Sequence, residues 1–339
     1  MKSRLILALV ILFSAATAAA QQRERRAPDT DQTVPVARGT RLTVESFAGE
    51  VVIRTEARDT LRVTARHSSR SKVEIRTTPS GVLLQSHGSA ASQSIDYEIT
   101  APAWMPVKVT GTYSFVSIEG VASEVSAETV RGDIVIKGGT GFVTARSIEG
   151  EVIVEGSRGR VSVSSVNEGV RITGASGDIA AETTNGDISL TGIESQSVEA
   201  TTVNGDIVYE GSIAANGRYR FATHNGDITL GVPEAANATF TVRTYNGDFE
   251  NSFGLKPSGE VRRGRPSTYV MGSGAAEVEL ESFSGSLEIR RAGTLPQSKS
   301  RGKEKENDDE EETPQFEEAI TFERTFPAGT CQPAAINVF

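Results

Sequence analysis

Residues Thr183 to Leu190 read Thr-Thr-Asn-Gly-Asp-Ile-Ser-Leu, and close copies of this stretch recur along the chain. The copies follow at Thr202 to Val208, Thr223 to Leu230 and Thr244 to Phe249, and a looser copy stands earlier at Thr129 to Ile136. Each copy is a polar turn flanked by alternating apolar residues. Such a repeat describes an architecture before it describes a chemistry.

Three columns of residues keep the same period. A hydroxyl recurs in steps of 18, 18, 18, 19, 21 and 21 residues, at Thr129, Ser147, Ser165, Thr183, Thr202, Thr223 and Thr244. Three residues after most of these hydroxyls comes a glycine, at Gly132, Gly150, Gly186, Gly205, Gly226 and Gly247, with Glu168 in the place of one. A second glycine column lies about half a period away, at Gly120, Gly138, Gly156, Gly174, Gly192, Gly211 and Gly231. Columns that drift together indicate one repeated structural unit.

Apolar residues alternate on both sides of each turn, as in Ile188/Leu190 after one turn and Val198/Ala200 before the next. Alternation places each pair on one face of a strand. A unit with two short strands cannot bury that face alone, whereas stacked copies bury it as one continuous column. The sequence therefore predicts an all-β, single-domain β-solenoid (β-helix) with coils of roughly 18–21 residues and a less regular β cap at its N-terminal end.

A hairpin sheet is the competing interpretation, because Asn-Gly is also a strong hairpin signal. Only a stack requires the same residue type at the same place in every repeat, because each residue then lies about 4.8 Å above its counterpart. The hydroxyl column fits a stack, since hydroxyls can form hydrogen bonds along it. The corner glycines are expected to have positive φ or to lie where a side chain would clash.

The first twenty residues have the pattern of a secretory signal peptide: Lys2 and Arg4, an apolar run from Leu5 to Phe13, and Ala18-Ala19-Ala20 before Gln21. The apolar run is too short for a transmembrane anchor, so we expect no stable membrane span after cleavage. Loss of the two cations moves the formal net charge from −9 to −11. An acidic exported protein is a poor candidate for binding nucleic acid or anionic lipid.

Composition divides the rest of the chain. We expect a flexible lead-in at 21–39, capping strands at 40–106, the solenoid at 107–291 with an insertion at about 251–276, a disordered charged linker at 292–315 and a C-terminal tail at 316–339. Arg262, Arg263 and Arg265 make the insertion basic. The single cysteine, Cys331, lies in the tail, so it has no partner for an intramolecular disulfide.

One acid follows the corner glycine in most coils, at Asp133, Glu151, Asp187, Asp206, Asp227 and Asp248. A row of carboxylates could bind a divalent cation such as calcium. The favoured alternative is that each aspartate accepts hydrogen bonds from backbone amides of its own turn. No metal site is therefore assigned, and no cofactor is expected.

Nothing in the sequence resembles a catalytic motif. The three histidines, His67, His87 and His224, are far apart in the sequence, and His224 stands at the repeat position of Val203 and Tyr245, which predicts a solvent-facing side chain. Arg131-Gly132-Asp133 spells an integrin-binding tripeptide but is one instance of the repeated turn. We expect no catalytic residues, although a polysaccharide-acting β-helix enzyme stays as a less favoured alternative.

The chain resembles a bacterial family of exported, adhesin-like proteins of uncharacterised function that have a toast-rack-like β-solenoid domain. The resemblance covers roughly residues 40–291 and depends on Phe47-Ala48-Gly49, the segment from Ile95 to Pro102 and the repeated Asn-Gly-Asp-Ile units. It implies a cell-envelope setting, in the periplasm or at the cell surface. The expected function is a non-enzymatic adhesin or binding module for an envelope protein or an extracellular polymer. The alternative is a periplasmic scaffold or sensor domain that acts through a protein partner.

Overall fold

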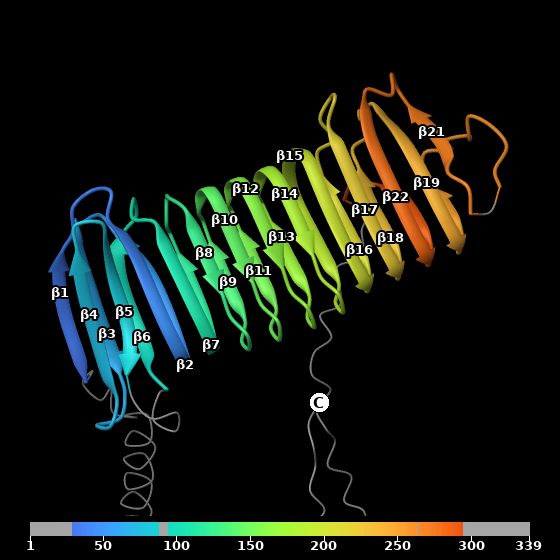
Figure 1. Ribbon diagram of the computed structural model, residues 1–339. Coiled ribbons are helices and arrows are strands. Elements are labelled where there is room, and N and C mark those ends of the chain that lie inside the picture. The colour runs from blue at the N-terminus through green and yellow to red at the C-terminus, as the bar shows by residue number, and fades with distance from the viewer. Residues whose placement is uncertain (1–28, 88–93, 263, 294–339) are drawn as a thin grey trace, which may run out of the picture. The chain divides into compact units, whose positions relative to one another are not determined.

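The computed structural model describes residues 29–87, 94–262 and 264–293, and every regular element among them is a β-strand. All the strands, β1 to β23, belong to one hydrogen-bonded sheet that winds around a common axis (Figure 1). The predicted signal peptide, most of the charged linker, the C-terminal tail and Cys331 lie outside the described residues.

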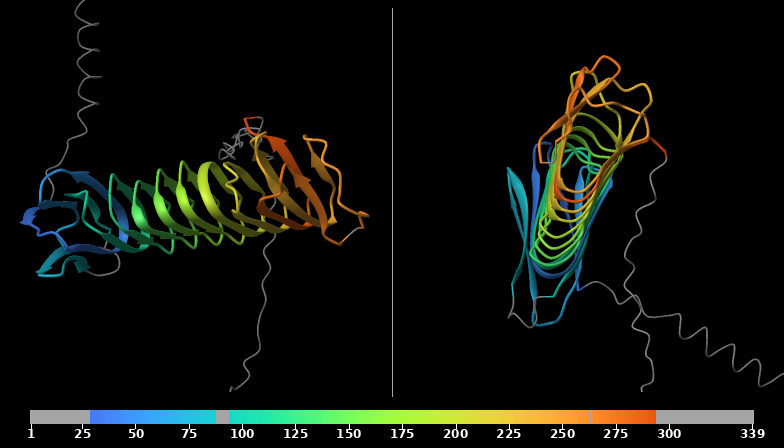
Figure 2. Two further views of the ribbon diagram at one scale, coloured as in Figure 1. Left: turned by 90° about the horizontal axis from the view of Figure 1, so that it is seen from above. Right: turned by 90° about the vertical axis from the view of Figure 1, so that its right-hand side faces the viewer.

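The middle of the chain forms coils with one strand on each of two faces. The first face contains β8 (Val125–Glu128), β10 (Thr140–Arg146), β12 (Arg158–Ser164), β14 (Ser176–Glu182), the second half of β15 (Ile188–Asn204) and β17 (Arg218–Asn225). The second face contains β9 (Ile134–Lys137), β11 (Val152–Glu155), β13 (Val170–Thr173), the first half of β15, β16 (Ile207–Gly211) and β18 (Ile228–Val232). Figure 2 shows these coils nested and flattened when viewed along the axis.

Neighbouring coils pair in parallel, with matching repeat positions side by side. Val125 is the partner of Val143, which pairs with Val161, and the series continues through Ile179, Val198 and Tyr219. These partners are 18, 18, 18, 19 and 21 residues apart in sequence. The predicted all-β solenoid is therefore confirmed, and the hairpin alternative is wrong for this part of the chain.

The core is the narrow space between the two faces. Alternate residues of both faces, such as Ile188, Leu190 and Ala200, are completely buried. Aromatic side chains enter where the coils lengthen: Tyr209 packs against Phe221 with ring centroids 5.1 Å apart. The hydroxyl of Tyr209 donates to the carbonyl of Ser212 at 2.7 Å, and burial raises the pKa of this phenol. The longer coils thus enclose a larger core.

One hydrogen bond recurs at the corner between the faces. The hydroxyl of Thr202 donates to the carbonyl of Gly186 at 3.1 Å, and Thr223 repeats this bond to Gly205 at 3.0 Å. Thr183 donates to Glu168, which occupies the place of the missing glycine, at 2.9 Å. The predicted role of the hydroxyls thus needs one correction. They link neighbouring coils, but their acceptors are main-chain carbonyls, because those carbonyls are left without a partner in the ladder.

Close approach is the reason for glycine at this corner. A Cβ on Gly205 would overlap the carbonyl oxygen of Gly186, and a Cβ on Gly226 would overlap that of Gly205. Gly226 also has a φ of 156°, whereas Gly186 and Gly205 lie outside the left-handed region. Left-handed backbone is the rule at the opposite corner, at Gly120, Gly138, Gly156, Gly174 and Gly192.

The N-terminal end is built from β1 (Thr30–Pro35), β2 (Arg41–Glu56), β3 (Thr60–Arg66), β4 (Lys72–Thr78), β5 (Gly81–His87), β6 (Asp96–Pro102) and β7 (Val107–Glu119). Strands β2 and β7 each run through the corner and pair in parallel, from Leu42 with Val107 to Arg54 with Glu119. Strands β5 and β6 pair with the outer side of β2, and β4, β3 and β1 add antiparallel partners beyond them.

Two predicted boundaries therefore change at this end. Regular stacking begins at β2 instead of residue 107. The outermost coil consists of β5 and β6, which lie between β2 and β7 in the sequence but pair with the outer side of β2. Residues 30–35, predicted as part of a flexible lead-in, form β1, whose Val34 pairs with Leu61.

The C-terminal end contains β19 (Ala238–Asn246), β20 (Phe249–Asn251), β21 (Ser267–Met271), β22 (Ala276–Ser284) and β23 (Leu287–Arg291). Strand β22 pairs in parallel with β17 on one side and with β19 on the other, and β23 lies likewise between β18 and β20. The last coil is thus inserted between two coils that precede it in sequence. The prediction of one coil interrupted at 251–276 is wrong: this segment returns the chain, and its β21 pairs antiparallel with β19.

Opposite charges face each other across these strands. On the first face, Glu279 of β22 lies 3.9 Å from Arg220 of β17, and Glu281 pairs with Arg243 of β19. Insertion therefore gives the acidic strand β22 a cation from each neighbour. Each exposed pair contributes little stability. Opposite charges across paired strands nevertheless favour this strand order over one that leaves the glutamates of β22 at an edge.

We expect Gly205→Val to lower the free energy of unfolding by about 3 kcal/mol, because the new Cβ would force the coils apart at the carbonyl of Gly186. The melting temperature, followed by circular dichroism, should fall by several degrees. Gly259→Val is the matched control, since no atom lies near the Cβ position of this glycine. Equal melting temperatures for the two variants would contradict the close-approach explanation.

Cysteine pairs can test the inserted coil. In a Cys331→Ser background, Ala222→Cys with Glu281→Cys should oxidise to an intramolecular disulfide, because these positions are direct partners, about 4.8 Å apart. Ala222→Cys with Arg243→Cys should stay reduced, because β22 separates them. Thiol titration and non-reducing electrophoresis measure both. A stack in sequence order would give the opposite pattern.

Candidate functional site

The repeated corner presents three outward columns that run along the stack. After each buried hydroxyl, the next residue points outward and forms the first column. The residue after that stands at the Asn position of the repeat and forms the second column. The acid that follows the glycine forms the third column. The coil spacing places members of one column about 4.8 Å apart. Because the sequence unit repeats, each column presents similar chemistry over many coils.

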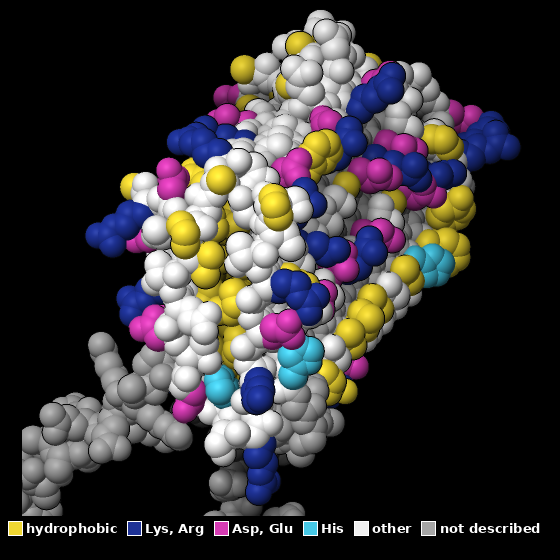
Figure 3. Space-filling view, turned by 60° about the vertical axis from the view of Figure 1, so that its left-hand side comes forward, with side chains coloured by type: hydrophobic (Ala, Val, Ile, Leu, Met, Phe, Trp, Pro, Cys, Tyr) yellow, Lys and Arg dark blue, Asp and Glu magenta, His cyan; other side chains and the backbone are white. Residues whose placement is uncertain are grey.

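We name the first column the apolar ridge and define it as Val130, Ile148, Val166, Thr184, Val203, His224, Phe283 and Tyr245. The exposed fractions of Val130, Ile148 and Val203 are 44%, 43% and 43%. Figure 3 shows hydrophobic side chains in a line along one long edge, with a histidine among them. Contiguous exposed apolar surface of this kind is a common mark of a binding site.

Three rings form the C-terminal part of the apolar ridge. The ring of His224 stacks on Phe283 with centroids 4.7 Å apart and an interplanar angle of 8°. Phe283 in turn lies 5.3 Å from Tyr245. His224 is solvent-facing as predicted, but its contact with Phe283 was not foreseen, because it depends on the inserted coil. Ser282-Phe283-Ser284-Gly285, itself a copy of the repeated corner, is the sequence signal for it.

The second column is a ladder of side-chain amides. Asn225 donates to Asn204 at 2.8 Å, Asn204 to Asn185 at 2.8 Å, and Asn185 to Asn167 at 3.3 Å. A ladder bond uses one N–H and one lone pair of an amide that lies within the row, so such a side chain retains a second N–H and a second lone pair. The amide column can therefore both donate to and accept from a ligand beside the ridge.

The integrin-like tripeptide is part of this corner. Arg131 occupies the Asn position, and its guanidinium pairs with Glu149 of the next coil at 2.6 Å. The carboxylate of Asp133 accepts the N–H of Glu151 at 2.9 Å. Both charged side chains are thus engaged within the stack, in keeping with a structural origin of the tripeptide.

The acid column links coils. One oxygen of Asp187 accepts the N–H of Asp206 at 2.8 Å, Asp206 accepts that of Asp227 at 2.8 Å, and Asp227 accepts that of Ser286 at 2.7 Å. The expectation that each aspartate binds amides of its own turn is wrong: the amide comes from the next coil, because in-register stacking brings it directly over the carboxylate. Within residues 29–87, 94–262 and 264–293, no three His, Cys, Asp or Glu side chains form a group suited to a metal ion.

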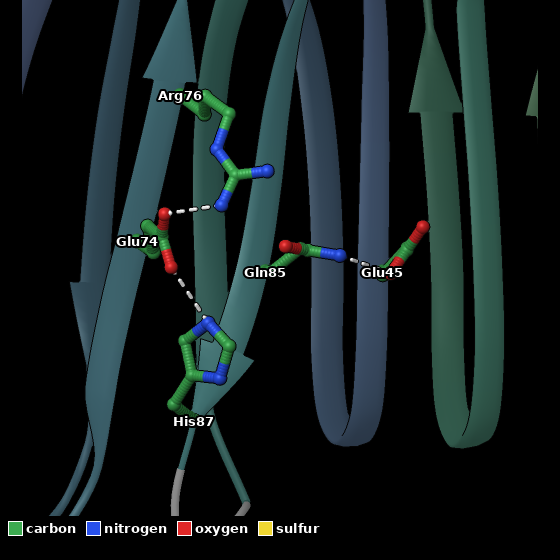
Figure 4. A network of polar contacts seen from close by, with 5 residues as sticks. All are labelled: Glu45, Glu74, Arg76, Gln85 and His87. Atoms are coloured by element: carbon green, nitrogen blue, oxygen red, sulfur yellow. Dashed lines mark hydrogen bonds and ion pairs between the residues drawn. The ribbon is translucent and has the colours of Figure 1, made fainter.

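A second polar cluster lies on the hairpin of β4 and β5, at the N-terminal end of the first face (Figure 4). Glu74 accepts hydrogen bonds from Arg76 and from His87, each at 2.8 Å, and Gln85 donates to Glu45 at 2.7 Å. The bond from Arg76, with that from His87, lowers the pKa of Glu74. All these side chains are solvent-exposed or nearly so, and β4 is an edge strand, where charged side chains discourage pairing with another chain.

The three histidines, far apart in the sequence, do not come together in the structure. His67 lies within 2.9 Å of the Thr30 hydroxyl, His87 contacts Glu74, and His224 stacks on Phe283. None of these contacts joins one histidine to another. The structure thus places the histidines at two ends of the stack instead of in one site.

The first face is hollowed next to β17, with two shallow adjoining depressions of about 410 and 570 Å³ that share Glu199 and Arg220. Charges of both signs line them, and Arg220 and Arg218 lie 3.9 and 3.5 Å from Glu279 and Glu277. These depressions therefore offer mutually paired charges, in contrast to the predominantly apolar surface of the ridge.

Substitutions at Asp187 can separate a structural acid from a cation ligand. Asp187→Asn keeps an oxygen to accept the N–H of Asp206 and removes a like charge, so the melting temperature should stay within about a degree. Asp187→Ala loses the bond and should lower the free energy of unfolding by about 1 kcal/mol. Calcium, added during calorimetry, should shift neither variant nor the parent. A calcium-induced rise that Asp187→Asn abolishes would establish a cation site instead.

Comparisons with known proteins bear on the family of the chain. One solved structure similar to the chain is that of a "putative cell adhesion protein" from Clostridium sporogenes, with 11% identity, coverage of 77% of this chain and 99% of that chain, and a TM-score of 0.22. A comparison with curated proteins finds no match. No helix among the described residues is long and apolar enough to cross a bilayer. The family model described as Toastrack DUF4097 matches residues 39–290, in line with the resemblance seen in the sequence, and the chain belongs to this family.

Proposed function

We propose that the protein is a non-enzymatic, exported binding module of the cell envelope that contacts its ligand through the apolar ridge. The observation that carries this proposal is the exposure of aliphatic side chains at the same place in successive coils. Thr184 occupies the same position in its coil, so the fold accepts a polar residue there and does not itself require an apolar one. Exposed apolar surface gains free energy when a partner covers it, by about 25 cal/mol per Å².

Other features support a role in the envelope. The first twenty residues have the pattern of a signal peptide, and the acidic composition disfavours nucleic acid and anionic lipid as partners. The separate histidines and the acids engaged in coil-to-coil bonds favour binding over catalysis. We propose that the protein is located in the periplasm or at the cell surface.

A retention experiment tests the proposal. Residues 21–339, immobilised on beads, should retain a component of solubilised envelope from the producing cells. The triple variant Val130→Thr, Ile148→Thr and Val203→Thr should retain at least about tenfold less, equivalent to 1.4 kcal/mol, because it removes apolar contact without disfavouring the strand.

The control makes the same kind of change outside the ridge. Phe142, Val261 and Val270 are exposed by 56%, 59% and 45%, and their replacement by threonine should leave retention unchanged. Equal retention by the two triple variants, with unchanged melting temperatures, would refute the apolar ridge as the contact surface.

A further inference from the structure

We propose that the ligand of the apolar ridge is a linear, uncharged polysaccharide that lies along the stack axis, against the ridge and the amide column. This inference deepens the proposed function and rests on it. Three observations lead to it: the shape of the ridge, the hydrogen bonds already made by the corner backbone, and the charge beside the ridge.

The shape of the ridge favours a linear ligand. From Val130 to Tyr245 the column crosses seven coil steps of about 4.8 Å, or about 34 Å in all, and it is one side chain wide. A strip about 10 Å wide and of this length has an area of about 340 Å². A stable protein interface needs about 800 Å² from each partner. The ridge alone supplies less than half of the area that a globular partner or a second copy of this chain would need, whereas an extended polymer can follow the whole strip.

The corner backbone disfavours an extended peptide as that polymer. The N–H of Asn204 donates to the carbonyl of Thr184 at 2.8 Å, and the N–H of Gly186 donates to the carbonyl of Asn204 at 2.9 Å. Peptides that bind along a sheet do so by pairing with a free strand edge. In the stack these groups are already paired with neighbouring coils, so a peptide backbone would leave its own polar groups without partners. A polysaccharide needs only side-chain partners for its hydroxyls.

The two columns match the two kinds of surface on a sugar chain. Sugar rings present C–H groups, which can pack on Val130, Ile148 and Val203. Their hydroxyls can bond to the amide column, which runs beside the ridge from Val166 to His224 and where Asn185 and Asn204 retain a donor and an acceptor beyond the ladder. Near the C-terminal end, His224 and Phe283 face each other along the axis, so their ring edges meet the ligand. These edges are the electropositive part of an aromatic ring and attract hydroxyl oxygens.

Charge disfavours an anionic chain. The carboxylates of Asp187, Asp206 and Asp227 run parallel to the ridge, and the protein carries a formal net charge of −9. An anionic polymer would meet a row of like charges beside the apolar contacts. Near the N-terminal end, Arg131 is paired with Glu149 and supplies no compensating free cation. Alginate and other polyanions should therefore not bind.

The first arm of the test analyses what the beads retain. Material eluted from immobilised residues 21–339 should contain neutral sugar and little protein or uronic acid, and it should rebind after exhaustive protease digestion. An eluate composed of protein that protease destroys would overturn the polysaccharide assignment while the binding-module proposal survives. Absence of any ridge-dependent retention would refute both.

The second arm uses defined probes in affinity electrophoresis: soluble linear glucans and fully N-acetylated chito-oligosaccharides as uncharged chains, and alginate as the anionic control. Mobility should fall with at least one uncharged chain, and the dissociation constant should rise at least about tenfold in the Val130→Thr, Ile148→Thr, Val203→Thr variant but not in the Phe142, Val261, Val270 control. Asn185→Ala with Asn204→Ala should also weaken binding. Binding of alginate alone, or equal binding by the ridge and control variants, would overturn the inference.

Discussion

The hydrogen bond from a buried hydroxyl to the corner carbonyl of the preceding coil is the contact on which the rest of the structure depends. It satisfies a main-chain acceptor that the strand ladders leave unpaired, as in the bond from Thr202 to Gly186. The donor can reach the carbonyl only because the corner residue above it has no side chain: a Cβ on Gly205 would occupy the same space as the oxygen. Hydroxyl and glycine are therefore required together.

The outward columns follow from the same geometry. With the hydroxyl directed inward and the glycine pressed against its neighbour, the residues between and after them must face solvent. In-register stacking then aligns like with like, so Asn204 meets Asn185 and Asn225, and Asp206 meets the amide of Asp227. The apolar ridge thus arises from one variable position in an otherwise constrained corner. Many weak contacts repeated along it can add up to useful affinity for a repetitive ligand.

The sequence was informative wherever one coil resembles the next. The repeat at Thr183 to Leu190 was enough to predict a β-solenoid, hydroxyls that form hydrogen bonds between coils and a row of acids, because each of these properties is local to a corner. It did not reveal the order of the last coils, because the corner at Gly285 repeats the pattern of the other corners and the order involves contacts between residues far apart in the sequence, such as Glu279 and Arg220. The sequence does not predict the ridge, because a valine after a threonine is ordinary strand sequence. Its exposure becomes evident only when the corner geometry is known.

The inserted coil has a mechanical consequence. Strand β23 is the last described strand, yet it is held between β18 and β20 and lies away from the edge of the stack. Tension applied at Arg291 along the direction of the strand would load two parallel ladders at once, so their hydrogen bonds would have to break together. A terminal strand at an open edge would instead peel away one bond at a time. The chain order at this end therefore makes the solenoid suited to bearing a pulling force from its C-terminal side.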